Sequence, residues 1–102
     1  MAYRYFVRFE WDPAKEAANR SKHGLSFGEV TALFTGAADY LEIPDILHDD
    51  DEERFIAIGP IRRGIVLVVF TERFEDTIRI ISARRATRAE ITLYRKHLGT
   101  EP

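Results

Sequence analysis

The stretch from Thr77 to Tyr94 reads TIRIISARRATRAEITLY and combines a strand signal, a group of arginines and the clearest helix start in the chain. The isoleucines in its first half are β-branched and favour a strand. Thr87 followed three residues later by Glu90 fits a capping box, which predicts that a helix begins there. Such a strand-to-helix junction can present cations and helix-terminal N–H groups to an anion, and the alternative is a solvated charged rim. The arginines of the junction are Arg79, Arg84, Arg85 and Arg88.

Two more β-branched or aromatic runs precede this stretch. The three runs span residues 54–58, 65–71 and 77–83, and their short connections favour an antiparallel meander. The middle run is apolar at successive positions, so we expect it to be buried on both faces at the centre of the sheet. After the meander we expect a final helix from Arg88 to about Leu98.

The N-terminal part of the chain predicts a strand followed by a helix. Aromatic residues alternate over positions 3–11, and this period of two favours a strand. Asp12-Pro13 matches an N-cap followed by proline at the first helical position, and Gly24 fits the stop after His23. The helix between them lacks large apolar residues, so it can cover a sheet only through its alanines.

A second capping box, Ser26 with Glu29, predicts another helix that ends at Gly36. Residues 37–43 are a weaker strand candidate, and the acidic segment 45–53 is typical of a loop. The order of elements predicts the α+β class, with an antiparallel sheet, two N-terminal helices and a C-terminal helix.

Length and composition indicate one globular domain over residues 1–102. Hydrophobic residues make up 45% and charged residues 31%, which excludes a generic disordered chain. The formal net charge of −2 does not indicate a nucleic-acid binder, but the charges are unevenly distributed. Residues 42–53 contain seven acids and no Lys or Arg, whereas residues 73–97 contain seven Lys or Arg and three acids. We therefore expect one acidic edge and one basic face.

The chain has no cysteine, so disulfides and thiolate catalysis are excluded. Arginines interrupt the opening residues where a signal peptide needs an apolar run, and no stretch approaches the roughly 20 apolar residues of a membrane span. We expect a cytoplasmic protein with no membrane association.

No glycine-rich phosphate loop, nucleophile elbow or zinc spacing is present, and the three histidines lie far apart. The run from His48 to Asp51 is rich in oxygen ligands, but a solvated loop is the better interpretation because such tracts usually lack fixed geometry. We expect no metal and no cofactor.

Lys22-His23-Gly24 places a cation, a titratable imidazole and a glycine stop together. The helix dipole alone favours Lys and His at this position, and we give this alternative equal weight. Arg79 lies inside an expected strand, where its guanidinium must reach solvent, a carboxylate or a ligand. Arg84 and Arg85 close that strand on opposite faces. A phosphate-binding face and internal pairing with Glu90 or the acidic loop remain equal alternatives for these arginines.

A set of motifs spread from about Phe9 to Tyr94 resembles the BrnT family of bacterial type II toxins. The motifs are Trp11-Asp12, Lys15, Asn19, Lys22-His23-Gly24, Ser26-Phe27, Glu53-Arg54, Gly59, Ile80-Ile81-Ser82-Ala83-Arg84, Ala86, Thr87, Glu90 and Tyr94. The early Lys-His-Gly combined with the late Ile-Ser-Ala-Arg is more specific than either piece alone. The resemblance implies a RelE-like fold, ribonuclease activity that blocks translation, and neutralisation by a BrnA-type antitoxin that carries a DNA-binding module.

Together the resemblance and the residue chemistry suggest a metal-independent endoribonuclease that contacts DNA only through its antitoxin, in a hetero-oligomer. The candidates for proton transfer and transition-state charge are Lys22, His23, Glu53, Arg79, Arg84 and Tyr94. The candidates for RNA binding are Lys15, Arg54, Arg73, Arg85 and Arg88. The alternative is a non-catalytic module whose basic face docks a DNA-binding partner and acts with it as a co-repressor.

Overall fold

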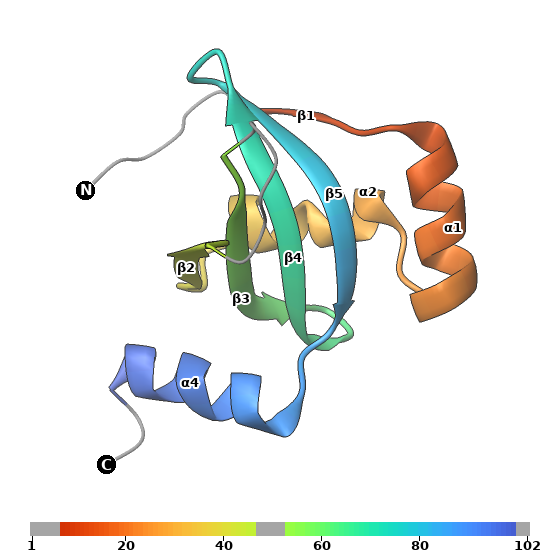
Figure 1. The fold of residues 1–102 in the computed structure, drawn as a ribbon. Coiled ribbons are helices and arrows are strands. Elements are labelled where there is room, and N and C mark those ends of the chain that lie inside the picture. The colour runs from red at the N-terminus through yellow and green to blue at the C-terminus, as the bar shows by residue number, and fades with distance from the viewer. Residues whose placement is uncertain (1–6, 47–52, 100–102) are drawn as a thin grey trace.

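A computed structural model describes residues 7–46 and 53–99 and shows a five-stranded sheet with helices on both of its faces (Figure 1). The elements are β1 (Arg8–Glu10), α1 (Pro13–His23), α2 (Phe27–Val30), α3 (Ala32–Thr35), β2 (Leu41–Pro44), β3 (Phe55–Ile61), β4 (Gly64–Arg73), β5 (Thr77–Arg85) and α4 (Arg88–Leu98). The expected α+β class, with helices segregated from the sheet, is confirmed. The expected acidic edge falls largely on residues 47–52, which lie outside the described residues.

The strand order is β1-β5-β4-β3-β2, so the apolar run in β4 is central as predicted. β3, β4 and β5 form the expected antiparallel meander. Our boundary for β3 was too short, because the strand continues through Gly59 and Pro60 and only Arg62 and Arg63 form the turn. Gly59 fits there for a steric reason: a Cβ on it would lie 2.6 Å from Leu33 Cδ1. The missing side chain therefore lets α3 pack closely against β3.

The first strand differs from the expectation. Within the described residues it covers only Arg8–Glu10, and it pairs with β5 in parallel, from Arg8 beside Thr77 to Glu10 beside Arg79. The expected start at residue 3 lies outside the described residues. The sheet is therefore mixed. Because β1 and β5 are far apart in sequence and no hairpin joins them, their pairing does not have to be antiparallel. Beyond Arg79 this edge of β5 faces α1 instead of another strand.

The helix ends follow the sequence signals closely. The Asp12 carboxylate accepts a hydrogen bond from Ala14 N–H at 2.8 Å, and Gly24 closes α1 at φ 73°. Both predicted capping boxes are formed, at the starts of α2 and α4. The single helix expected between residues 26 and 36 is instead two short helices separated at Thr31, whose hydroxyl donates to the Gly28 carbonyl at 2.8 Å. This side-chain bond competes with regular helix continuation.

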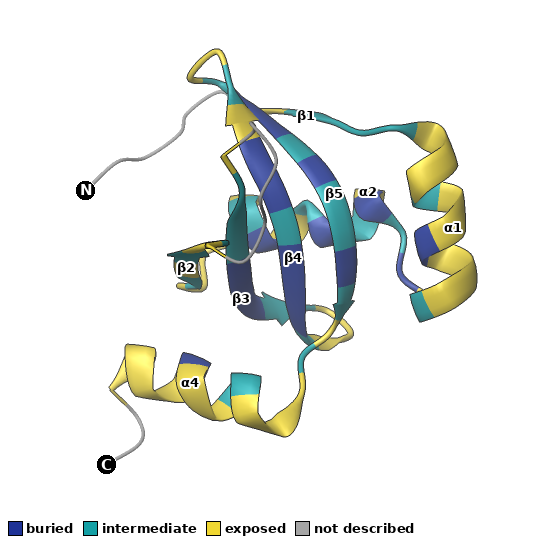
Figure 2. Cartoon of the chain, viewed as in Figure 1, coloured by how far each residue is buried: buried dark blue, intermediate teal, exposed yellow. Residues whose placement is uncertain are grey.

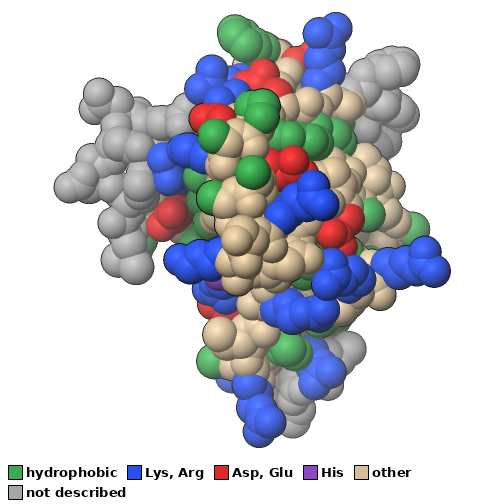
Figure 3. Space-filling model, turned by 90° about the vertical axis from the view of Figure 1, so that its right-hand side faces the viewer, with side chains coloured by type: hydrophobic (Ala, Val, Ile, Leu, Met, Phe, Trp, Pro, Cys, Tyr) green, Lys and Arg blue, Asp and Glu red, His purple; other side chains and the backbone are tan. Residues whose placement is uncertain are grey.

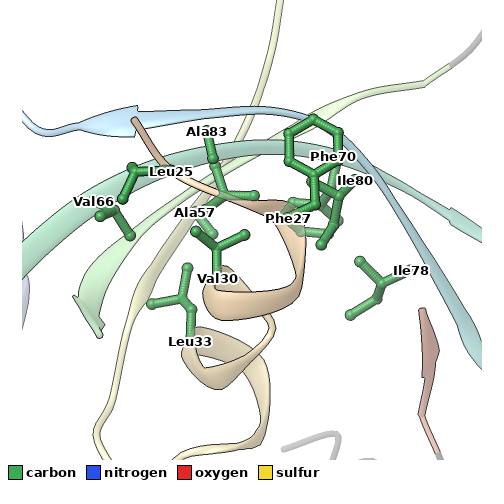
Figure 4. Packing of buried hydrophobic residues seen from close by; sticks show 11 residues of the cluster. Leu25, Phe27, Val30, Leu33, Ala57, Val66, Phe70, Ile78, Ile80 and Ala83 are labelled. Carbon is green, nitrogen blue, oxygen red and sulfur yellow. The ribbon is translucent and has the colours of Figure 1, made fainter. Parts of the chain in front are cut away.

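The main core lies between the sheet and α2–α3. Phe27 and Phe70 are fully buried at its centre, with aliphatic side chains around them (Figure 4). Each such side chain stabilises the fold by roughly 1.5–3 kcal/mol relative to exposure. A smaller cluster of Ile58, Leu67 and Tyr94 lies on the other face beneath α4. Because α4 covers only one end of that face, half-buried side chains of β5 remain accessible beside it (Figure 2).

Candidate anion-binding site

The stripe of α1 that faces the edge of β5 is polar. Lys15, Asn19 and Lys22 recur at i, i+4 and i+7, which places them on one side of the helix. A helix that packs on a sheet normally presents apolar residues at these positions. In α1 the only buried residue is Asn19. The polar composition of this stripe therefore favours a role in binding over a role in packing.

Asn19 attaches α1 to the part of β5 that has no neighbouring strand. Its side-chain nitrogen donates to the carbonyls of Ala83 at 2.8 Å and Leu25 at 3.0 Å, and its oxygen accepts from the Ala83 N–H at 3.0 Å. The amide thus bonds to both backbone groups of Ala83, as an adjacent strand would. With a relative exposure of 7%, Asn19 is buried and all of its bonds are made to protein.

An open pocket of about 230 Å³ lies between α1 and β5. Its cationic wall comes from Lys15 and Lys22, with His23 beside them, and Ile81 and Ser82 line it on the side of β5. Ile81 is the extra residue of a β-bulge, because Val69 pairs with Ser82 whereas the next residue, Phe70, pairs with Ile80. Bulges of this kind redirect side chains beside binding sites. Lys22 and His23 also lie in the last turn of α1, where the helix dipole favours cations.

Figure 3 views the molecule from the side on which α1 lies, and Lys and Arg side chains gather in the lower half of this view. The pocket combines two ammonium groups, an imidazole and a hydroxyl around a space that is open to solvent. Such a donor set suits an anion such as a phosphate, and the imidazole adds a group that can take or give a proton near neutral pH.

Arg79 flanks the pocket on the accessible face of β5. Strand alternation and the bulge place Arg79, Ser82 and Arg84 on the same face, opposite the buried Ile80 and Ala83. Arg79 Nη1 lies 3.0 Å from Glu10 Oε2, across the parallel pair. Arg73 Nε lies 3.7 Å from the same carboxylate oxygen. Glu10 thus holds two of the candidate cations together.

Arg84 forms a two-pronged ion pair with Glu90, at 2.8 and 2.9 Å. For this arginine, internal pairing with Glu90 is therefore observed. The Arg84 guanidinium holds the pKa of Glu90 at about 2, below its usual 4.5, and Glu90 in turn raises the pKa of Arg84. The same carboxylate accepts from Thr87 N–H at 2.8 Å and so caps α4. The pair fixes the angle at which α4 leaves β5.

The ion pair predicts a stability loss in acid. Because the pKa of Glu90 is lower in the folded state, its contribution is fully present above about pH 4.5 and is lost as the pH falls through about 2. Glu90→Gln removes the charge but keeps a side chain that can complete the capping box. Since the Arg84 side chain is 37% exposed, we expect a loss of only about 1 kcal/mol at neutral pH. Urea unfolding across the acid range should show the stabilities of the two proteins converging, and a difference that stays undiminished below about pH 2 would contradict the assignment.

The other candidates lie away from the pocket. Glu53 precedes β3, on the far side of β4 from the pocket, and its carbonyl accepts from the Thr71 hydroxyl at 2.7 Å. Tyr94 is buried, and its hydroxyl donates to the Asp39 carbonyl at 2.8 Å. Burial, with a smaller effect of the Asp39 carboxylate, raises the pKa of this hydroxyl. Arg54 stands beside Glu53 at the start of β3 and is half-buried.

The remaining RNA-binding candidates lie at the lower end of the sheet. Arg85 is exposed at the end of β5, and its guanidinium donates to the Arg63 carbonyl at 2.8 Å. Arg88 is exposed at the first position of α4. The structure thus brings Lys15, Lys22 and His23 together at one pocket, with Arg79 and Arg84 on the adjacent face.

Two residues that help to build the pocket had no site role in the sequence analysis. They are Asn19, which positions α1, and Ser82, which lines the pocket on the side of β5. The spacing of Lys15, Asn19 and Lys22 was the available signal for Asn19. Ser82 could not be found in this way, because the bulge that places it becomes visible only once the strand register is known.

No group of three or more His, Cys, Asp or Glu in residues 7–46 and 53–99 could hold a metal ion. In the same part of the chain, no helix has the length and apolar character needed to cross a membrane.

Fold and site together define a small α+β protein with a cationic pocket at an open sheet edge. A family profile described as "Ribonuclease toxin, BrnT, of type II toxin-antitoxin system" matches residues 11–90. The chain therefore belongs to the BrnT family of ribonuclease toxins of type II toxin–antitoxin systems. Membership implies an antitoxin partner.

A solved structure supports this assignment. The crystal structure of the Brucella abortus ribonuclease toxin BrnT is similar to this chain, with a TM-score of 0.60 and 26% sequence identity, and the match covers 80% of this chain and 99% of the Brucella chain. A comparison with curated protein sequences found no match. The resemblance to the BrnT family that the sequence motifs carry is confirmed.

Proposed function

We propose that this toxin is a metal-independent endoribonuclease that inhibits translation by cleaving RNA and is neutralised by a BrnA-type antitoxin. The observation that carries the proposal is the pocket in which Lys15, Lys22 and His23 face Ser82 at the bulged edge of β5. Family membership supplies the ribonuclease activity. The pocket suggests where an RNA phosphate binds.

In this chemistry the ribose 2′-OH attacks the adjacent phosphorus, and the 5′-oxygen of the next nucleotide leaves. The products are a 2′,3′-cyclic phosphate and a new 5′-hydroxyl. The site must take the proton from the 2′-OH, return a proton to the leaving oxygen and stabilise the extra negative charge of the phosphorane. Positioned cations and a titratable imidazole meet these needs without an external nucleophile.

We assign proton transfer to His23, and charge stabilisation to Lys15 and Lys22. Arg79 and Arg84 are placed to hold the flanking RNA, because each stands on the accessible face of β5 near Ser82. Both are held by carboxylates in this structure, so RNA has to compete with Glu10 and Glu90 for them. We give Glu53 and Tyr94 no direct part in the chemistry, since Glu53 lies beyond β4 from the pocket and the Tyr94 hydroxyl donates to the Asp39 carbonyl.

Expression in a bacterial host tests the biological role. We expect growth arrest, fragmented transcripts and a drop in amino-acid incorporation when the wild-type chain is induced, and rescue when a BrnA-type antitoxin is co-expressed. Arg84→Ala should weaken the effect, because the variant loses a cation of the RNA-binding face. Normal growth and intact transcripts in cells that contain folded wild-type protein would contradict the proposal and would favour the co-repressor alternative.

A further inference from the structure

Four arginines lie where the β3–β4 turn, the end of β5 and the start of α4 come together at one end of the sheet. We call this group the basic ridge and define it as Arg62, Arg63, Arg85 and Arg88. Arg63 Nη1 donates to the Gly24 carbonyl at 2.9 Å, which places the β3–β4 turn against the end of α1 that carries Lys22 and His23. Arg85 in turn donates to the Arg63 carbonyl. The ridge is therefore continuous with the pocket.

The carboxylates near the ridge are already engaged. Glu29 lies 3.0 Å from Arg63, and its pKa is lowered first by a backbone bond from Ser26 and further by Arg63. Glu90 pairs with Arg84. Arg62 and Arg88 are exposed, and neither side chain has a hydrogen bond or ion pair to the described residues. Arg88 also occupies the first position of α4, where the helix dipole disfavours a cation.

The end of the sheet away from the ridge is mixed in charge. Glu72, Glu75 and Asp76 surround the β4–β5 turn, but Arg73 lies there too, and Asp76 pairs with Arg8 at 3.7 Å. A polyanion is therefore attracted more strongly to the ridge, where Arg62 and Arg88 have no carboxylate partner among the described residues. Lys and Arg side chains are visible in the lower half of Figure 3.

The composition of the ridge favours nucleic acid over a protein partner. The large exposed apolar side chains in residues 7–46 and 53–99 are Ile46, Phe74, Leu93 and Leu98, and none of them belongs to the ridge. Protein interfaces usually have an apolar centre, whereas a phosphate backbone is bound mainly by Arg and Lys. The four cations come from a turn, a strand end and a helix start, an irregular arrangement that one flexible backbone can follow better than the two backbones of a stiff duplex.

We infer that the basic ridge binds the backbone of single-stranded RNA that extends from the pocket. This inference rests on the proposed function, because it takes the pocket as the site of cleavage. Arg85 and Arg63 are held in place by their backbone contacts, and Arg62 and Arg88 are free to contact phosphates. The ridge therefore contributes affinity for the substrate, and the pocket performs the chemistry.

The test uses a 12-nucleotide 2′-O-methyl RNA, which cannot undergo attack by a 2′-OH, with binding followed by fluorescence anisotropy over a range of salt concentrations. The variant Arg62→Ala/Arg88→Ala removes two proposed phosphate contacts. We expect the slope of log K against log salt to become less steep by about 1.4, which is about 0.7 per contact for a single strand. The matched control Arg8→Ala/Lys96→Ala removes two exposed cations away from the ridge and should keep the wild-type slope.

The possible outcomes test the role of the ridge and the role of the pocket independently. An unchanged slope in the ridge variant, or equal losses in the variant and the control, would overturn the inference. Preferential binding of the duplex form of the same oligonucleotide would overturn the assignment to single strands. Parallel assays on unmodified RNA test the proposed function independently. If the wild-type protein cleaves RNA and the ridge variant has an unchanged KM, only the role of the ridge is rejected. If binding depends on the ridge but no RNA is cleaved, only the proposed nuclease activity is rejected.

Discussion

Replacing Lys22 with alanine is expected to lower kcat/KM for RNA cleavage by about 10²–10³-fold, the range found when a preorganised charge-stabilising group is removed. Lys22 lines the pocket between α1 and β5, so its ammonium group is placed to stabilise the phosphorane. Arg20→Ala is the matched control, because it removes a neighbouring cation from the same helix and Arg20 does not line the pocket. This control should cleave RNA within a few-fold of wild type.

His23→Ala should reduce the rate by about 10²-fold or more and should also change the pH–rate profile, since the variant lacks the group to which we assign proton transfer. The profile distinguishes proton transfer from a purely structural role of His23. Equal rates for Lys22→Ala, Arg20→Ala and the wild type, in samples that unfold at the same urea concentration, would show that the pocket is not where cleavage occurs.

Replacing Asn19 with alanine is expected to lower the free energy of unfolding by about 3 kcal/mol. The substitution leaves the Ala83 N–H and the carbonyls of Ala83 and Leu25 without their partner, and unsatisfied buried polar groups cost about 1–3 kcal/mol each. Water that enters from the open pocket offsets part of this cost. Urea unfolding monitored by circular dichroism measures the change.

Ser21→Ala, at an exposed position of the same helix, is the control and should change stability by no more than about 0.5 kcal/mol. Asn19→Ala should also reduce cleavage beyond what the unfolded fraction explains, because α1 carries the cationic wall of the pocket. A stability equal to that of the control would mean that the amide bonds between α1 and β5 do not hold the helix in place.

Much of the fold could be predicted from local sequence signals. The caps at Asp12, Ser26 and Thr87 act within one turn of helix, and the continuous apolar run in β4 identifies a central strand by itself. The errors arose where distant segments decide the outcome. The parallel pairing of β1 depends on how the chain enters the sheet, and Gly59 lies within β3 because α3 packs against it.

The candidate site could be predicted as a set of residue types but not as an arrangement. Lys22-His23-Gly24 and the arginines of β5 stood out by chemistry. The partners of these residues could not be predicted. The Arg79–Glu10 pair, for example, spans 69 positions in sequence and depends on the register between β1 and β5. Arg84 had two equal alternatives in the sequence, and the geometry of the β5–α4 junction shows it paired with Glu90.

We propose above all that the chain's own cations and imidazole cleave RNA through the 2′-OH. The most direct measurement is to incubate purified wild-type protein with a defined RNA in excess EDTA, beside the same RNA with a 2′-deoxy sugar at the cleavage position. We predict cleavage of the first RNA only, to 2′,3′-cyclic phosphate and 5′-hydroxyl ends. Cleavage that requires added Mg²⁺, or that proceeds on the deoxy substrate, would contradict the account.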